Sequence, residues 1–132
     1  MKKENSNDLG LCSSSTDLSN HTLLNEEQAV SLENTFKILA NSSRLRILHA
    51  LVIEKEMCVS DLARLLNLNT TAVSNQLQRL TERGIVASRR EGLKVIYRIL
   101  DPCAISVMNY AWCLTQCAEC RKDQQDCLKR IP

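Results

Sequence analysis

The sequence predicts a mainly α-helical domain that carries one small β-hairpin, and three observations support this class. Apolar residues recur at helical spacing between residues 26 and 83, alternate with polar residues after Gly84, and return to helical spacing after Pro102. The chain has 132 residues, which is about the size of one domain. Its hydrophobic content of 44% and charged content of 24% are typical of a globular protein.

Four helices are expected before Gly84, at residues 26–40, 43–52, 60–66 and 70–83. Asn25 is a suitable cap for the first helix, because its side chain can accept a hydrogen bond from a backbone N–H of the first turn. Gly84 follows the fourth helix, as glycine commonly does at a helix end. An apolar stripe on the first helix is formed by Ala29, Leu32, Phe36 and Leu39.

A β-hairpin is expected after the fourth helix, with strands at residues 85–90 and 95–99 and Gly92 in the connecting turn. A last helix begins at Pro102, because proline is favoured at the first helical position. A short helix, a tight turn at residues 67–69, a second helix and a hairpin follow one another in the order of a winged helix-turn-helix. In this fold the second helix of the pair enters the DNA major groove.

The middle of the chain has the charge and the side chains that suit a DNA partner. Residues 42–98 carry ten basic and five acidic groups, whereas residues 1–41 carry three basic and six acidic groups. The inward face of the 70–83 helix is expected to hold Val73, Leu77 and Leu80. The predicted DNA contacts are Thr70, Thr71, Ser74, Asn75 and Gln78 on this helix and Arg89, Arg90 and Lys94 on the hairpin. An ordinary solvated surface is the alternative interpretation of these polar residues.

Seven cysteines are the strongest compositional signal, at positions 12, 58, 103, 113, 117, 120 and 127. The polar first 20 residues do not resemble a signal peptide, and no apolar run is long enough to span a bilayer. A cytoplasmic protein with no membrane partner is therefore expected. In a reducing compartment such cysteines more often bind metal ions or sense redox state than form a disulfide scaffold.

The sequence resembles the ArsR/SmtB family of metal-responsive repressors over residues 26–118. Four segments carry the resemblance: Leu39–Leu48 is similar to the family's LADPTRLRIL segment, Glu56–Leu62 to its ELCVCDL metal box, Ala72–Leu77 to its VSHQL recognition helix, and Arg89–Tyr97 to its wing. The family often has histidine where Asn75 stands here.

The resemblance implies a homodimer built on the first and last helices. It also implies that the metal-free dimer binds double-stranded operator DNA and releases it when an inducer binds. The expected division is a flexible arm over residues 1–22, the dimeric winged helix-turn-helix domain over 23–120 and a tail over 121–132. The expected effector is a thiophilic ion of the Cd(II), Pb(II), Zn(II) or As(III) class, because thiolate ligands prefer soft ions.

A first metal site implied by the resemblance joins the N-terminal arm of one subunit to the 60–66 helix of the other. Cys58 lies in the metal box, and Cys12 precedes it by close to the family spacing. Cadmium- and lead-sensing members have a second thiol where this chain has Ser60, so His21 is a candidate third ligand. The alternative is that Cys58 is a small buried apolar residue of the core.

A second candidate site lies on the last helix. Cys113, Cys117 and Cys120 are spaced four and three residues apart, which places them on one helix face. Cys113 and Cys120 are about 10 Å apart along an unbroken helix, so one ion held by all three requires local unwinding or a ligand from the partner subunit. The resemblance adds Asp101 and Cys103, which stand where zinc-sensing members have ligands. The alternative is a dimer interface lined by small apolar residues.

Three other functions compete with a metal-responsive repressor. Cysteine pairs of the same fold can instead sense oxidants or sulfide by forming disulfides or persulfides. A constitutive DNA-binding module with structural cysteines is a second alternative. An enzyme is not expected, because the Cys117–Cys120 CxxC spacing lies in a helix without the surrounding strands of a redox domain, and neither histidine lies in a catalytic motif.

Overall fold

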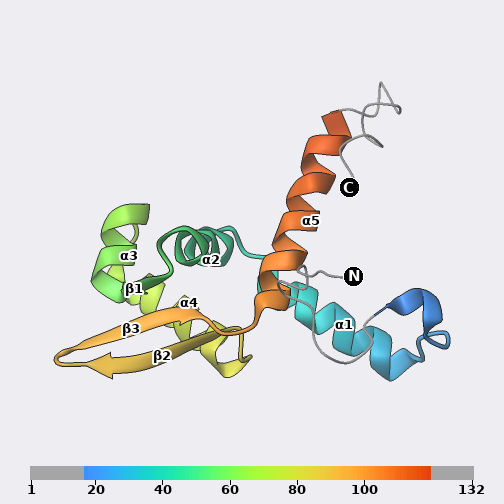
Figure 1. Ribbon diagram of the computed structural model, residues 1–132, viewed down its shortest axis with the longest axis horizontal. Helices are drawn as coiled ribbons and strands as arrows, with labels where there is room; N and C mark the ends of the chain where they lie inside the picture. The colour runs from blue at the N-terminus through green and yellow to red at the C-terminus, as the bar shows by residue number, and fades with distance from the viewer. Residues whose placement is uncertain (1–16, 120–132) are drawn as a thin grey trace, which may run out of the picture.

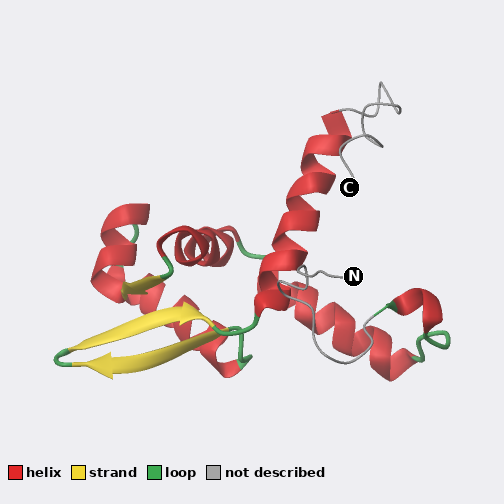
Figure 2. Ribbon diagram, in the orientation of Figure 1, coloured by secondary structure: helices red, strands yellow, loops and turns green. Residues whose placement is uncertain are grey.

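The computed structural model describes residues 17–119, with side chains up to Cys117; residues 1–16 and 120–132 lie outside the described part. The elements in this part are the 3-10 helix η2 (Leu18–Asn20), α1 (Glu26–Leu39), α2 (Ser42–Glu54), β1 (Glu56–Cys58), α3 (Val59–Leu66), α4 (Thr70–Glu82), β2 (Val86–Glu91), β3 (Lys94–Ile99) and α5 (Pro102–Glu119). The mainly helical class with a small hairpin is confirmed (Figures 1 and 2).

Asparagine caps the start of three helices. The Asn25 side chain accepts the backbone N–H of Gln28 at 2.8 Å, and the Gln28 side chain accepts the N–H of Asn25 in return, which forms a capping box. Asn41 and Asn69 cap α2 and α4 in the same way, through side-chain oxygens that accept backbone N–H groups. These caps satisfy N–H groups that a helix leaves without an internal partner, and they fix where each helix begins.

The core lies where α2, α3, α4 and the sheet meet. The largest fully buried side chains are Ile47, Leu48, Leu51, Leu62, Val73, Leu77, Leu80 and Val86. Three of them come from α4, so the predicted inward face of this helix is confirmed. Burial on this face leaves the opposite side of α4 exposed to solvent.

The sheet has three antiparallel strands in the order β1-β3-β2, one more strand than the sequence predicts. In β1, Met57 pairs with Tyr97 of the central strand. A strand of three residues is too short to show an alternating pattern, so only its pairing with a distant segment reveals it. The turn between β2 and β3 is also shorter than expected: it holds only Gly92 and Leu93, and Gly92 has a φ of +64°. A positive φ at the first turn position is typical of a type II′ hairpin.

Two helices keep large apolar side chains in solvent. In α1 only Leu39 is buried, whereas Phe36 is 55% exposed. In α5 the exposed apolar residues are Tyr110, Trp112 and Leu114. Figure 1 shows α5 extending away from the core and α1 lying on the side opposite the hairpin tip. Among residues 17–119, no helix combines the length and apolar character that a membrane span needs.

Candidate nucleic-acid interface and cysteine sites

The outer face of α4 presents the polar side chains predicted to contact DNA. All five residues assigned to it are exposed: Thr70, Thr71, Ser74, Asn75 and Gln78. Asn67, with a φ of 55° and a ψ of 49°, makes the left-handed turn that ends α3 three residues before α4 begins. Asparagine tolerates this conformation better than most residues, so the turn holds the two helices at a fixed angle. Hydroxyl and amide groups on such a face can reach base edges.

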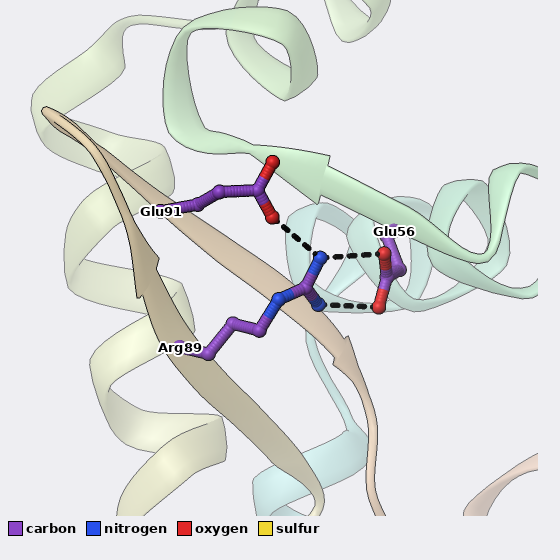
Figure 3. A network of polar contacts seen from close by, with 3 residues as sticks. All are labelled: Glu56, Arg89 and Glu91. Atoms are coloured by element: carbon purple, nitrogen blue, oxygen red, sulfur yellow. Dashed lines mark hydrogen bonds and ion pairs between the residues drawn. The ribbon is translucent and has the colours of Figure 1, made fainter.

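The hairpin β2–β3, called the wing below, carries the three predicted cations, but they differ in their surroundings. Arg90 and Lys94 are exposed and form no ion pair with any residue of the described part. Arg89, by contrast, bonds Glu56 through both terminal nitrogens and Glu91 through one of them (Figure 3). Hydrogen bonding from Arg89 lowers the pKa of the Glu56 carboxyl, and hydrogen bonding from Glu56 raises the pKa of Arg89.

A buried arginine that is absent from the predicted site residues contacts α4 on the side of α2. Arg44 of α2 is 8% exposed, and its Nη1 donates to the Gln76 side-chain oxygen at 2.9 Å. Its Nε is buried without a hydrogen-bond partner in the described residues. A buried cation is stabilised by the hydrogen bonds it makes, so the Gln76 contact ties the position of α4 to α2. The α2 helix carries two arginines, Arg44 and Arg46, and the sequence alone does not show which of them is buried.

The metal-box cysteine occupies a core position at the junction of β1 and α3. Cys58 is 5% exposed, and its Sγ lies 3.2 Å from the Ser60 Oγ. His21 is exposed, and its Nδ1 lies 2.6 Å from the backbone oxygen of Thr22. Cys12 lies outside the described residues. In the part of the chain with described side chains, no group of three His, Cys, Asp or Glu side chains converges to hold a metal ion.

Two of the predicted metal ligands on α5, Cys113 and Cys117, lie side by side. The Sγ atoms of Cys113 and Cys117 are 3.8 Å apart, and both side chains are half-buried. With Zn–S bonds of about 2.3 Å, two thiolates of a tetrahedral site are separated by about 3.8 Å. The pair therefore has the separation of two ligands around one thiophilic ion without rearrangement of the helix.

Two other predicted ligands of this site, Asp101 and Cys103, lie at the start of α5. Cys103 precedes Cys113 by ten residues on the same helix, which is about 15 Å along its axis. The Asp101 carboxylate accepts the backbone N–H of Cys103 at 2.9 Å and so supports the start of α5. Cys120 lies outside the described residues. One described subunit thus brings together two thiols, and a third ligand has to come from another segment or from a partner subunit.

Comparison with known proteins agrees with this architecture. Residues 41–88 match the family described as "Bacterial regulatory protein, arsR family". The crystal structure of the AntR antimony-specific transcriptional repressor superimposes with a TM-score of 0.69 at 40% identity, and the match covers 84% of this chain and all of that one. The chain belongs to the ArsR family. This family consists of DNA-binding regulatory proteins and not of enzymes, which confirms that the chain is not an enzyme.

Two further relatives of this ArsR-family chain extend the comparison. The cadmium resistance transcriptional regulatory protein CadC of Listeria innocua is 38% identical over 79 residues, which cover 60% of this chain and 64% of that protein. The match thus spans less than two thirds of that relative. A homodimeric winged helix-turn-helix DNA-binding domain from Mycobacterium bovis is 30% identical, with a TM-score of 0.61 over 72% of this chain and 90% of that one. The predicted winged helix-turn-helix fold is confirmed.

Proposed function

We propose that this protein is a transcriptional repressor that binds operator DNA and releases it when a thiophilic metal or metalloid ion binds its cysteines. The observation that carries the proposal is α4, which buries one face in a helix-turn-helix core and presents hydroxyl and amide groups on the other. An exposed helix of this composition fits the major groove, where such groups read base edges.

The proposed DNA-binding unit is a homodimer. The apolar side chains that α1 and α5 expose are numerous enough to need a cover, and the Mycobacterium bovis relative is described as homodimeric. In a two-fold dimer the two α4 helices would enter successive major grooves about 34–36 Å apart. We assign residues 23–120 to this dimeric domain, residues 1–22 to its arm and residues 121–132 to a tail.

The proposed DNA contacts divide into two groups. The first group reads base edges, since an amide can form two hydrogen bonds with adenine, and it consists of Ser74, Asn75 and Gln78. Thr70 and Thr71 belong to the same face and lie at the start of the helix. Arg90 and Lys94 bind phosphates beside the groove, because they are exposed and no carboxylate of the described part neutralises them. Arg89 differs from both, because it already bonds two carboxylates.

The proposed effector site is built on the Cys113–Cys117 pair. Its 3.8 Å separation suits a thiolate-bound Cd(II), Pb(II), Zn(II) or trivalent arsenic or antimony ion. Cys120 or the partner subunit's Cys103 supplies the third thiolate, with Asp101 close to the latter. Relatives named for cadmium and antimony support this class of ion. The Cys12–Cys58 pair is the second candidate site, and it requires Cys58 to leave its buried position.

Ion binding and DNA binding are coupled when the ion favours a dimer geometry that does not fit the operator. Such coupling is typically worth about 1–3 kcal/mol, or roughly a 5- to 150-fold change in operator affinity. Thiolate ligation also releases protons, so the effector should bind more weakly as the pH falls.

Operator binding measured by fluorescence anisotropy, with and without Cd(II), Zn(II), arsenite or antimonite, tests this proposal. We expect the metal-free dimer to bind a promoter fragment in chelator and reductant, and at least one ion to weaken it. Cys117→Ser should abolish the response while Cys58→Ser keeps it; the reverse result would move the site to α3. A protein that binds no promoter fragment, or whose affinity none of the ions changes, would overturn the proposal.

A further inference from the structure

The Arg89 network, defined as Glu56, Arg89 and Glu91, connects the wing to the opposite edge of the sheet. The Arg89 Nη2 donates to Glu56 Oε1 at 3.0 Å and to Glu91 Oε2 at 2.8 Å, and its Nη1 donates to Glu56 Oε2. Figure 3 shows the guanidinium between the two carboxylates, with the Glu56 pair in a forked, two-bond arrangement. Bidentate pairing of this kind fixes the orientation of both groups.

The network spans all three strands. Glu56 belongs to β1 and Arg89 to β2, and β3 lies between these two strands. Ile96 of β3 is the register partner of Cys58 on one side and of Arg89 on the other. The Arg89 side chain therefore reaches over the central strand, so the pair restrains the two outer strands relative to each other.

The wing needs such a restraint because its outer half has little other support. The β1 strand pairs only with residues 96–98, whereas the hairpin continues to a turn at Gly92 and Leu93. Residues 88–94 are all exposed, so no core packing orients this half of the hairpin. An isolated two-stranded ribbon is marginally stable and strongly twisted, so its direction depends on contacts such as those of Arg89.

Charge argues against Arg89 as a phosphate contact. Two carboxylates surround the Arg89 guanidinium, so its positive charge is already compensated before any phosphate approaches. Arg89 would have to give up its bonds with Glu56 and Glu91 before it could bind DNA. The neighbouring Arg90 and Lys94 carry no such partners in the described part.

We infer that Arg89 is a positioning residue for DNA binding, which holds the wing against β1 so that Arg90 and Lys94 meet the phosphates. The inference builds on the proposed DNA-binding function, and it reassigns one residue that the sequence analysis places among the DNA contacts. Glu56 is the partner that makes the restraint, and Glu91 completes the charge compensation.

The salt dependence of operator affinity separates positioning from contact. A plot of log affinity against log salt concentration has a negative slope. Each lost phosphate contact makes this slope less steep by about 0.9. We expect Arg90→Gln to make the slope less steep by about 0.9. Arg89→Gln should leave the slope unchanged, because Arg90 and Lys94 still reach the phosphates once the wing is ordered on DNA. The cost of ordering the wing should weaken binding about two- to five-fold at every salt concentration. If Arg89→Gln makes the slope less steep by as much as Arg90→Gln does, the inference is overturned.

A double-mutant cycle gives the second criterion. If Glu56 holds Arg89 in place, Glu56→Gln weakens operator binding in the wild-type background and causes no weakening in the Arg89→Gln background. If instead Glu56 competes with DNA for Arg89, Glu56→Gln strengthens binding in the wild-type background only, and the inference is wrong. The Arg89→Gln background also measures the general effect of removing one negative charge beside DNA.

Hydrogen exchange of the backbone amides tests the restraint without DNA. We expect faster exchange in the amides of residues 86–91 and 94–99 in Arg89→Gln and in Glu56→Gln, and no further increase in the double variant. Unchanged exchange in both single variants would overturn the inference. Faster exchange in a protein that binds no operator would leave the restraint supported and reject the proposed function instead.

Discussion

Replacing Lys55 with glycine should stabilise the protein, although the change removes a side chain. Lys55 is the residue that follows α2, and it has a φ of 75° and a ψ of −53°. A residue other than glycine in such a sparsely populated region costs about 1–3 kcal/mol, whereas glycine adds about 0.5–1 kcal/mol of chain entropy lost on folding. The net expectation is a gain of about 1 kcal/mol in the free energy of unfolding.

The gain should not be offset by lost contacts. The Lys55 side chain is exposed and forms no ion pair within the described residues. Its backbone N–H donates to the Leu51 oxygen at 2.9 Å, a bond that glycine keeps. The strain therefore belongs to the backbone conformation and not to the lysine side chain.

Urea denaturation at one fixed protein concentration measures this effect, because the stability of a dimer depends on its concentration. Asn67→Gly is the matched control: Asn67 also has a positive φ, but it lies in the left-handed region that asparagine tolerates, so a change below about 0.5 kcal/mol is expected. Lys55→Ala removes the same charge, retains the strain and should not stabilise. Equal effects of the Lys55 and Asn67 glycine variants, or a stabilising Lys55→Ala, would refute the backbone explanation.

Three further predictions follow from the contacts described above. Gln76→Leu should lower the free energy of unfolding by about 1–3 kcal/mol in urea denaturation, because the buried Arg44 loses a hydrogen-bond acceptor; an unchanged midpoint would show that Arg44 does not need it. Asn69→Asp should keep the stability but weaken operator binding in an anisotropy titration, because an aspartate caps α4 equally well while it repels phosphates; equal affinity would argue against phosphates near this end of α4. The pKa of Glu56 is lowered by Arg89, so the pair stabilises the fold above the unfolded-state pKa and this contribution disappears as the pH falls through the lower folded-state pKa. Glu56→Gln should therefore flatten the acid side of a stability-against-pH curve, and a parallel curve would contradict this.

The helices and the hairpin could be predicted because their determinants are local. The capping side chain of Asn25, the glycine after α4 and the Pro102 start of α5 each act within a few residues. The strand β1 could not be predicted, because its three residues are extended only through pairing with β3, some forty residues later. Local patterns in a sequence carry no information about such pairing.

In the candidate sites too, features set by neighbouring residues could be predicted and features set by distant residues could not. The spacing of Cys113 and Cys117 predicts their adjacency on α5, since a helix brings residues four apart onto one face. The ion pairing of the wing could not be predicted in this way. In the sequence Arg89 is one of three similar cations, and its main partner, Glu56, is 33 residues away on another strand. The sheet order gives Arg89 partners that Arg90 lacks in the described part, and this order cannot be seen in the sequence.

The asparagine caps have a consequence for how this protein ages. An asparagine side chain slowly deamidates to aspartate or isoaspartate. Where the product is aspartate, its carboxylate retains the acceptor oxygen that a helix start requires. Conversion of Asn25, Asn41 or Asn69 to aspartate would therefore leave the helices intact, since each residue caps its helix through that oxygen. At Asn69 the same conversion would add a negative charge at the start of α4. The protein would then stay folded while its affinity for a polyanion falls.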